Sequence, residues 1–140
     1  MRKSAAALAF LVLTACSKPH PPQGKWEGGY DSNGTLVAAR VEIGADGQVK
    51  ISAPDLTNIQ NTRPEQLQQM RERLAADLAT AWDTVAPRPF DFDGSVFRKP
   101  GGVAPQMEWD KDSNQMTLEI YIGANAALPI PLRPVDSFHD

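Results

Sequence analysis

The architecture of this chain follows from one segment, Thr35-Leu-Val-Ala-Ala-Arg-Val-Glu-Ile43-Gly-Ala-Asp-Gly47-Gln-Val-Lys-Ile-Ser52. Successive side chains of a strand alternate between its two faces, so residues at every second position share a face. One face therefore carries Val37, Val41, Ile43, Val49 and Ile51. The other carries Arg40, Glu42 and Lys50. The pattern predicts an antiparallel pair with one buried face and one face in water, joined by a turn at Asp46-Gly47, where positive φ is tolerated.

A further strand precedes this pair at Lys25-Trp-Glu-Gly-Gly-Tyr30. It is separated from the next strand by Asn33-Gly34, a dipeptide typical of two-residue hairpin turns. The first half of the chain thus predicts a three-stranded meander.

The periodicity then changes from two to about 3.6, which indicates an amphipathic helix over residues 63–86. Thr62-Arg-Pro-Glu65 is typical of a capping box with proline at the first turn, and Pro87 ends the segment. The apolar stripe comprises Leu67, Met70, Leu74, Leu78, Trp82 and Val85. We expect this stripe to pack on the sheet; the alternative is a helix that binds a partner or a membrane surface.

Short strands return after the helix, at Phe90–Phe97, Gln106–Trp109 and Gln115–Ile122. In the first of them, the alternation places Phe90, Phe92 and Val96 inward. Leu128–Leu132 also alternates, but its two prolines cannot donate to a ladder, which predicts an edge strand or an extended strip. About seven strands and one long helix predict an α+β fold, a curved antiparallel sheet or partial barrel whose open face the helix covers.

The chain opens with Met1-Arg-Lys-Ser-Ala-Ala-Ala-Leu-Ala-Phe-Leu-Val-Leu-Thr-Ala-Cys16. A basic start, a short apolar core and small residues before the cleavage point are typical of a secretory signal, too short to span a bilayer as a helix. Leu13-Thr14-Ala15-Cys16 resembles the lipobox of bacterial lipoproteins, and Cys16 is the only cysteine of the chain. The alternative is an ordinary signal peptide cleaved beside an unpaired thiol.

The lipoprotein resemblance implies cleavage before Cys16, attachment of diacylglycerol to its sulfur, and usually acylation of the new amino group. Three acyl chains would anchor the protein firmly, since one chain alone binds a bilayer only marginally. By the same resemblance, Ser17 favours the outer membrane over the inner one. We therefore expect a protein held by lipid on the periplasmic face of the outer membrane.

Four segments follow from these patterns: a signal peptide at 1–15, a lipidated and proline-rich tether at 16–24, one α+β domain at 25–135, and a tail at 136–140. His20 lies in the tether and His139 in the tail, so neither is expected to be held rigidly. Removal of the signal peptide changes the formal charge from −3 to −5. An acidic body without a basic stripe has no electrostatic basis for binding nucleic acid.

Two groups of acidic residues suggest chemistry. Asp91 and Asp93 share a strand face, as paired carboxylates of a hydrolase would, although the alternation turns both to water. Asp110-x-Asp112-x-Asn114 copies the first ligands of a calcium loop, but Gln115 and Tyr121 replace its glycine and its bidentate glutamate. The second group is therefore interpreted as a polar hairpin tip, and no catalytic residue, metal site or cofactor is predicted.

Gly24-Lys25-Trp26 resembles the Gly-x-Trp signature of lipocalins. That resemblance implies a barrel that holds an apolar ligand, with Trp26 closing one end. The residues favour a core position for Trp26; Trp26, Trp109 and Tyr121 are the candidate contacts for a ligand or partner.

These observations predict a lipid-anchored envelope lipoprotein that acts as a non-enzymatic binding or assembly module. Its partner would be an envelope protein, peptidoglycan or a small apolar ligand. The alternatives are an envelope hydrolase that uses carboxylates alone and a lipocalin-like carrier of a small apolar ligand.

Overall fold

The computed structural model describes residues 18–32, 34–53, 57–123 and 126–139. The predicted signal peptide and its lipobox cysteine, Cys16, lie outside the described residues. Within these ranges the chain folds into one antiparallel sheet and one helix, which confirms the α+β class and the partial barrel.

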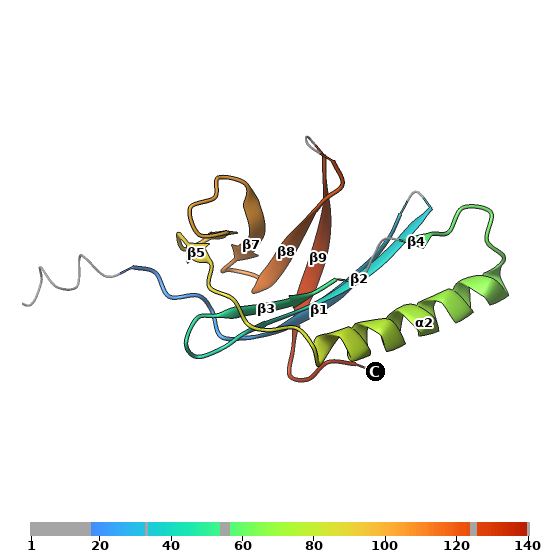
Figure 1. Ribbon diagram of the computed structural model, residues 1–140, viewed down its shortest axis with the longest axis horizontal. Helices are drawn as coiled ribbons and strands as arrows, with labels where there is room; N and C mark the ends of the chain where they lie inside the picture. Colours follow the sequence, from blue (N-terminus) through green and yellow to red (C-terminus); the bar gives the residue numbers. More distant parts are fainter. Residues whose placement is uncertain (1–17, 33, 54–56, 124–125, 140) are drawn as a thin grey trace, which may run out of the picture.

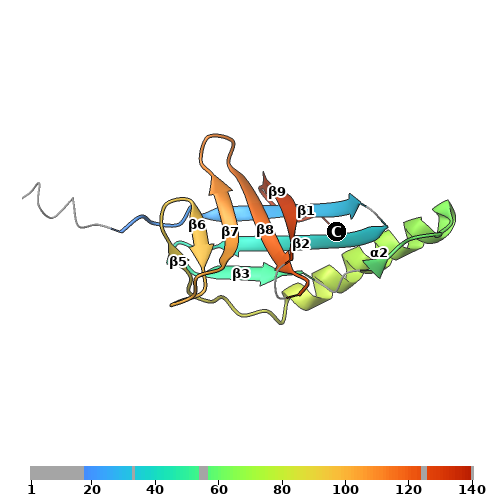
Figure 2. The same cartoon turned by 90° about the horizontal axis from the view of Figure 1, so that it is seen from above.

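Nine strands make up the sheet, two more than expected. They are β1 (Gly24–Ser32), β2 (Thr35–Ile43), β3 (Val49–Ser52), β4 (Thr57–Asn58), β5 (Asp91–Phe92), β6 (Val96–Arg98), β7 (Pro105–Asp110), β8 (Gln115–Tyr121) and β9 (Ala127–Val135). Eight of them follow the order β3-β2-β1-β9-β8-β7-β6-β5, and β4 pairs with β2. The sheet curls so that β6–β9 cross over one face of β1–β3 (Figure 2).

The inside of this curl is a packed apolar core. Alternate residues of β2 and β3 supply one side of it, as the period-two pattern predicts, and β6–β9 supply the other. Its largest fully buried side chains include Trp26, Ile43, Phe97, Met107, Met116 and Ile130. Because these side chains fill the space between the two limbs, the interior of the half-barrel is a core.

The helix α2 (Pro64–Trp82) packs on the outer face of the β1–β3 limb (Figure 1). Leu74 and Leu78 are buried there against β2, where Leu36 is also buried. The centre of the apolar stripe therefore lies on the sheet, whereas Leu67, Met70 and Trp82 are only partly buried and Val85 lies beyond the helix. The expectation that the second face of β2 lies in water is wrong for Leu36 and Arg40, both of which are buried beneath this layer.

The helix is shorter than residues 63–86. It begins at Pro64, with Arg63 in place of Thr62 as the N-cap, and the Arg63 N–H donates to Gln66 Oε1 at 3.4 Å. It ends at Trp82 because the hydroxyl and the N–H of Thr84 both donate to the Ala81 carbonyl. Such a side chain competes with the helical ladder and favours a turn.

The proline-containing strand β9 is central, between β8 and β1, and the prediction of an edge strand is wrong. β9 pairs with β8 from Ala127 to Leu132, but with β1 only from Arg133 to Val135. Backbone N–H groups alternate between the two sides of a strand, so Pro129 and Pro131 can turn their nitrogens away from β8. On that side β9 makes no ladder hydrogen bonds to β1 at these two positions, so the prolines remove none and are tolerated inside the sheet.

The segment after the helix is a hairpin, where one strand was expected. Phe92 of β5 faces Phe97 of β6, and their ring centroids lie 4.4 Å apart. The inward residue of β6 is consequently Phe97, which is fully buried, while Val96, expected to point inward, is only partly buried. The turn at residues 93–95 shifts the alternation by one position.

Two adjacent glycines of β1 meet different surroundings and provide a matched test of the fold. A Cβ at Gly28 would overlap the carbonyl oxygen of Pro131 in β9, whereas one at Gly29 would lie 3.4 Å from the carbonyl oxygen of Val37. We expect Gly28→Ala to destabilise the protein by about 1–3 kcal/mol and Gly29→Ala to change stability by less than about 0.5 kcal/mol. Urea unfolding followed by circular dichroism measures both; equal effects would contradict the close approach of β1 to β9.

Candidate binding site

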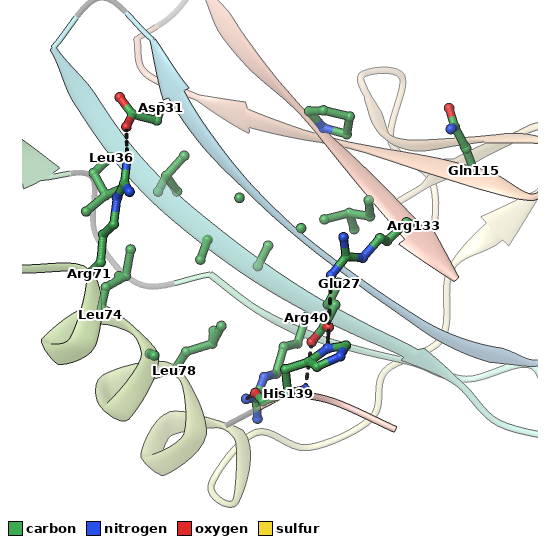
Figure 3. Close-up of a pocket in the computed structure, with 18 residues that line it drawn as sticks. Glu27, Asp31, Leu36, Arg40, Arg71, Leu74, Leu78, Gln115, Arg133 and His139 are labelled. Carbon is green, nitrogen blue, oxygen red and sulfur yellow. Dashed lines mark hydrogen bonds and ion pairs between the residues drawn. The ribbon is translucent and has the colours of Figure 1, made fainter. Parts of the chain in front are cut away.

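A groove of about 560 Å³ lies between α2 and the outer face of β1, β2 and β9 (Figure 3). Its volume is in the range of small-molecule sites, which run from about 300 to 1,000 Å³. It runs along β2 from Arg40 toward Leu36, and its lining comes from the outer face of the sheet, from α2 and from the C-terminal tail.

The middle of the groove is open because the residues facing each other there are small. Gly29 of β1 and Ala38 of β2 are cross-strand partners, and Ala75 lines the groove from the helix. None of these side chains is long enough to bridge sheet and helix. Leucines from both layers form the apolar walls: Leu36, Leu74 and Leu78.

One end of the groove carries a single ion pair between sheet and helix. Arg71 Nη2 of α2 lies 2.6 Å from Asp31 Oδ2 of β1 (Figure 3). Both side chains are half exposed, so the pair contributes little stability. The positive charge of Arg71 and the negative charge of Asp31 therefore cancel at this end of the groove.

The other end is closed by the C-terminal tail. Phe138 packs edge-on against Trp82 at 4.8 Å between centroids, and its ring lies 5.0 Å from the Arg40 guanidinium carbon. The backbone N–H and the ring Nδ1 of His139 both contact the Glu27 carboxylate. The expectation that His139 is not held is therefore wrong, because residues 138 and 139 are anchored to the sheet. His20, in contrast, has only a local bond, from Nδ1 to the Pro21 carbonyl.

Arg40 is the least satisfied polar group of this site. Its side chain is 5% exposed, and its Nη2 donates to the His139 carbonyl at 2.6 Å, but its Nε is buried without a partner. An unsatisfied buried donor costs about 1–3 kcal/mol, and more when it belongs to a charged group. This unsatisfied buried donor marks the end of the groove as a candidate site.

The three residues predicted as ligand or partner contacts are not brought together. Trp26 is 1% exposed inside the core, and its indole donates to the Asn114 carbonyl at 3.0 Å. Trp109 is partly buried, and its indole donates to Asn114 Oδ1 at 2.9 Å. Tyr121 is 44% exposed at the end of β8, and its hydroxyl donates to the Pro105 carbonyl.

These contacts give the hairpin tip at residues 110–114 a structural role. Asn114 has φ of 54° and holds both tryptophans through its two oxygens, which ties β1 to the β7–β8 turn. Asp110 Oδ1 accepts the N–H of Asp112, and hydrogen bonds from Ser113 and Asp112 lower the pKa of Asp110. The spacing that copies a calcium loop thus serves a turn. Among the residues with described positions, no group of three or more His, Cys, Asp or Glu could hold a metal ion.

The two acidic residues considered for hydrolysis contact separate backbone groups. Asp91 Oδ2 accepts the N–H of Gly101 at 3.1 Å. Asp93 Oδ1 accepts the N–H groups of Ser95 and Val96 at 2.9 and 2.8 Å, and Arg98 Nη1 lies 3.1 Å from its other oxygen. Both carboxylates therefore stabilise the β5–β6 region.

The groove was missed from sequence because its residues are spread over β1, β2, α2, β9 and the tail. A signal existed in Gly28-Gly29 and Ala38-Ala39, two pairs of small residues that the antiparallel register of β1 and β2 places opposite each other. In the described part of the chain, no helix is long and apolar enough to cross a membrane. No protein-family model, curated protein or solved structure matches the chain.

The role of Asp93 can be tested by its titration. Hydrogen bonds from the N–H groups of Val96 and Ser95, followed by that from Arg98, hold the pKa of Asp93 below its ordinary value. We expect NMR titration of Arg98→Ala to raise this pKa only part of the way. A return to the ordinary value would show that the backbone bonds are not the main cause. Because the folded-state pKa is lowered, the stabilisation is present above the unfolded-state pKa and is lost as the pH falls through the folded-state value.

Proposed function

We propose that the protein is a lipid-anchored, non-enzymatic binding protein of the bacterial envelope, with the groove between α2 and β1–β2–β9 as its binding site. The observation that carries this proposal is the groove itself, an apolar trough of about 560 Å³ with a buried, incompletely satisfied arginine at one end. Ligand sites are typically mostly apolar, with a few polar groups that fix orientation.

The position of the tether supports this role. Residues 18–23 join β1 at Gly24, the end of the sheet that also carries the turn between β2 and β3 (Figure 1). The Asp31–Arg71 pair lies near the opposite end of β1. An anchor at Cys16 would therefore place the Asp31–Arg71 end of the groove farther from the tether than the Arg40 end.

The anchor predicts a specific change when the cysteine is removed. In a Gram-negative host, we expect the wild-type protein to show a lipid-sized increase in intact mass and to fractionate with the outer membrane. Cys16→Ala should lose both properties, because no thiol remains to carry diacylglycerol, while Ser17→Ala should keep the added mass. An unmodified, water-soluble wild-type protein would contradict the anchor.

If the groove is a binding site, its ligand is expected to co-purify with the protein. We expect native mass spectrometry of the mature chain, extracted with its anchor, to show a non-covalent bound mass. Ala38→Phe should abolish it by filling the floor of the groove, and Ala76→Phe, on the exposed side of α2, should retain it. A bound mass that persists in Ala38→Phe would place the ligand outside the groove and contradict the proposal.

A further inference from the structure

We propose that the groove takes an amphipathic monocarboxylate of fatty-acid type, with its carboxylate on Arg40 and its apolar chain along β2 toward Leu36. This inference rests on the proposed function and specifies the chemistry of its ligand. Three observations carry it: the charge balance of the groove, the state of Arg40, and the course of the apolar walls.

Among the described residues of the groove, the ion pairs leave one positive charge unpaired, that of Arg40. Arg71 is paired with Asp31, and Arg133 Nη2 lies 3.9 Å from Glu27 Oε1. Within residues 18–139, where the structure describes them, no carboxylate comes within 4 Å of Arg40. The groove is therefore complementary to a ligand with a single negative charge.

This imbalance is notable because a partner for Arg40 is close by. Glu27 and Arg40 are cross-strand partners on the same face of the β1–β2 ladder, a position that favours an ion pair. The tail prevents it, since the Glu27 carboxylate is taken by the N–H and the ring of His139. Among the described residues, Arg40 donates to a single acceptor, the neutral carbonyl of His139.

A ligand carboxylate would supply the negative charge and the second acceptor that the His139 carbonyl does not give Arg40. Hydrogen bonds between charged groups are roughly twice as strong as neutral ones, and a guanidinium can serve two acceptors at once. Phe138 lies over the guanidinium and the His139 carbonyl holds Nη2, so both fix the side chain at the end of the groove. The Nε is covered as well as unpartnered, so it becomes a donor for the ligand carboxylate only when the side chains that cover it shift.

The apolar walls begin beside Arg40 and continue to Leu36. The two positions are four residues apart along the strand, which corresponds to about 13 Å. Over this distance the trough is lined by Ala38, Leu74, Ala75 and Leu78. A trough of this length and character fits an alkyl chain better than a sugar or a peptide, whose polar groups would find no partners along it.

Trp82 provides a reporter for the test, because it packs edge-on against Phe138 beside Arg40. The full chain, anchored in amphipol and labelled with 5-fluorotryptophan, is titrated with dodecanoate or dodecanol and followed by ¹⁹F NMR. We expect dodecanoate to shift the Trp82 resonance with at least tenfold higher affinity than dodecanol. The resonance of Trp26, in the core, should stay unchanged and serves as the internal control.

Variants distinguish the contribution of the Arg40 charge to binding from that of the apolar trough. Arg40→Gln should remove the preference for dodecanoate, whereas Arg73→Gln, an exposed arginine of α2 outside the groove, should keep it. Ala38→Phe should abolish binding of both probes. The preference in the wild-type protein needs no variant, so it remains decisive if Arg40→Gln does not fold.

The outcomes distinguish this inference from the proposed function. Equal binding of both probes that Ala38→Phe abolishes would overturn the role of Arg40 and leave the groove as a binding site. If neither probe binds while the co-purified mass still depends on Ala38, the ligand belongs to another chemical class and the inference is wrong. If that mass is also absent, the proposed function fails with it.

Discussion

The pairing of β1 with β9 is the constraint on which the rest of this structure depends. It spans only Lys25–Glu27 against Arg133–Val135, yet it joins a meander from the start of the chain to one from its end. Each meander alone would expose an apolar face, and small hairpin sheets without such cover are marginally stable. Just beyond the paired residues, Gly28 lets β1 approach the Pro131 carbonyl closely, which no other residue would allow without a shift. The core of Trp26, Phe97 and Ile130 is the consequence of this closure.

The same closure decides what the outer face of the sheet becomes. With the inner face of β2 buried by β6–β9, the helix covers the opposite face, and the sheet is left with a layer on either side. Leu74 and Leu78 bring α2 close to β2, while Gly29, Ala38 and Ala75 are too small to fill the remaining space. The groove is therefore a result of packing between leucines and a row of small residues, and its size follows from their side chains.

The C-terminal tail then sets the charge of this groove. It occupies Glu27 through His139 and stacks Phe138 on Arg40, so two opposite charges that face each other across a ladder do not neutralise each other. A buried guanidinium with an unused donor is unfavourable for stability, and the proposed binding of an anion beside it would offset this cost. Two residues of the tail, Phe138 and His139, thus give the site a polarity that the sheet and helix do not provide alone.

Local patterns in the sequence were sufficient for the hairpins at Gly34 and Gly47, the inward faces of β2 and β8, the central part of the helix, and the α+β class, because these depend on neighbours within a few residues. They failed where the outcome depends on distant partners. The prolines of β9 suggested an edge because the sequence cannot show that β1 diverges from them, and His139 looked free because its partner lies 112 positions away. The groove, the burial of Arg40 and the separation of Trp26, Trp109 and Tyr121 were decided only in three dimensions, where backbone approach and competition for acceptors select among contacts that the sequence leaves open.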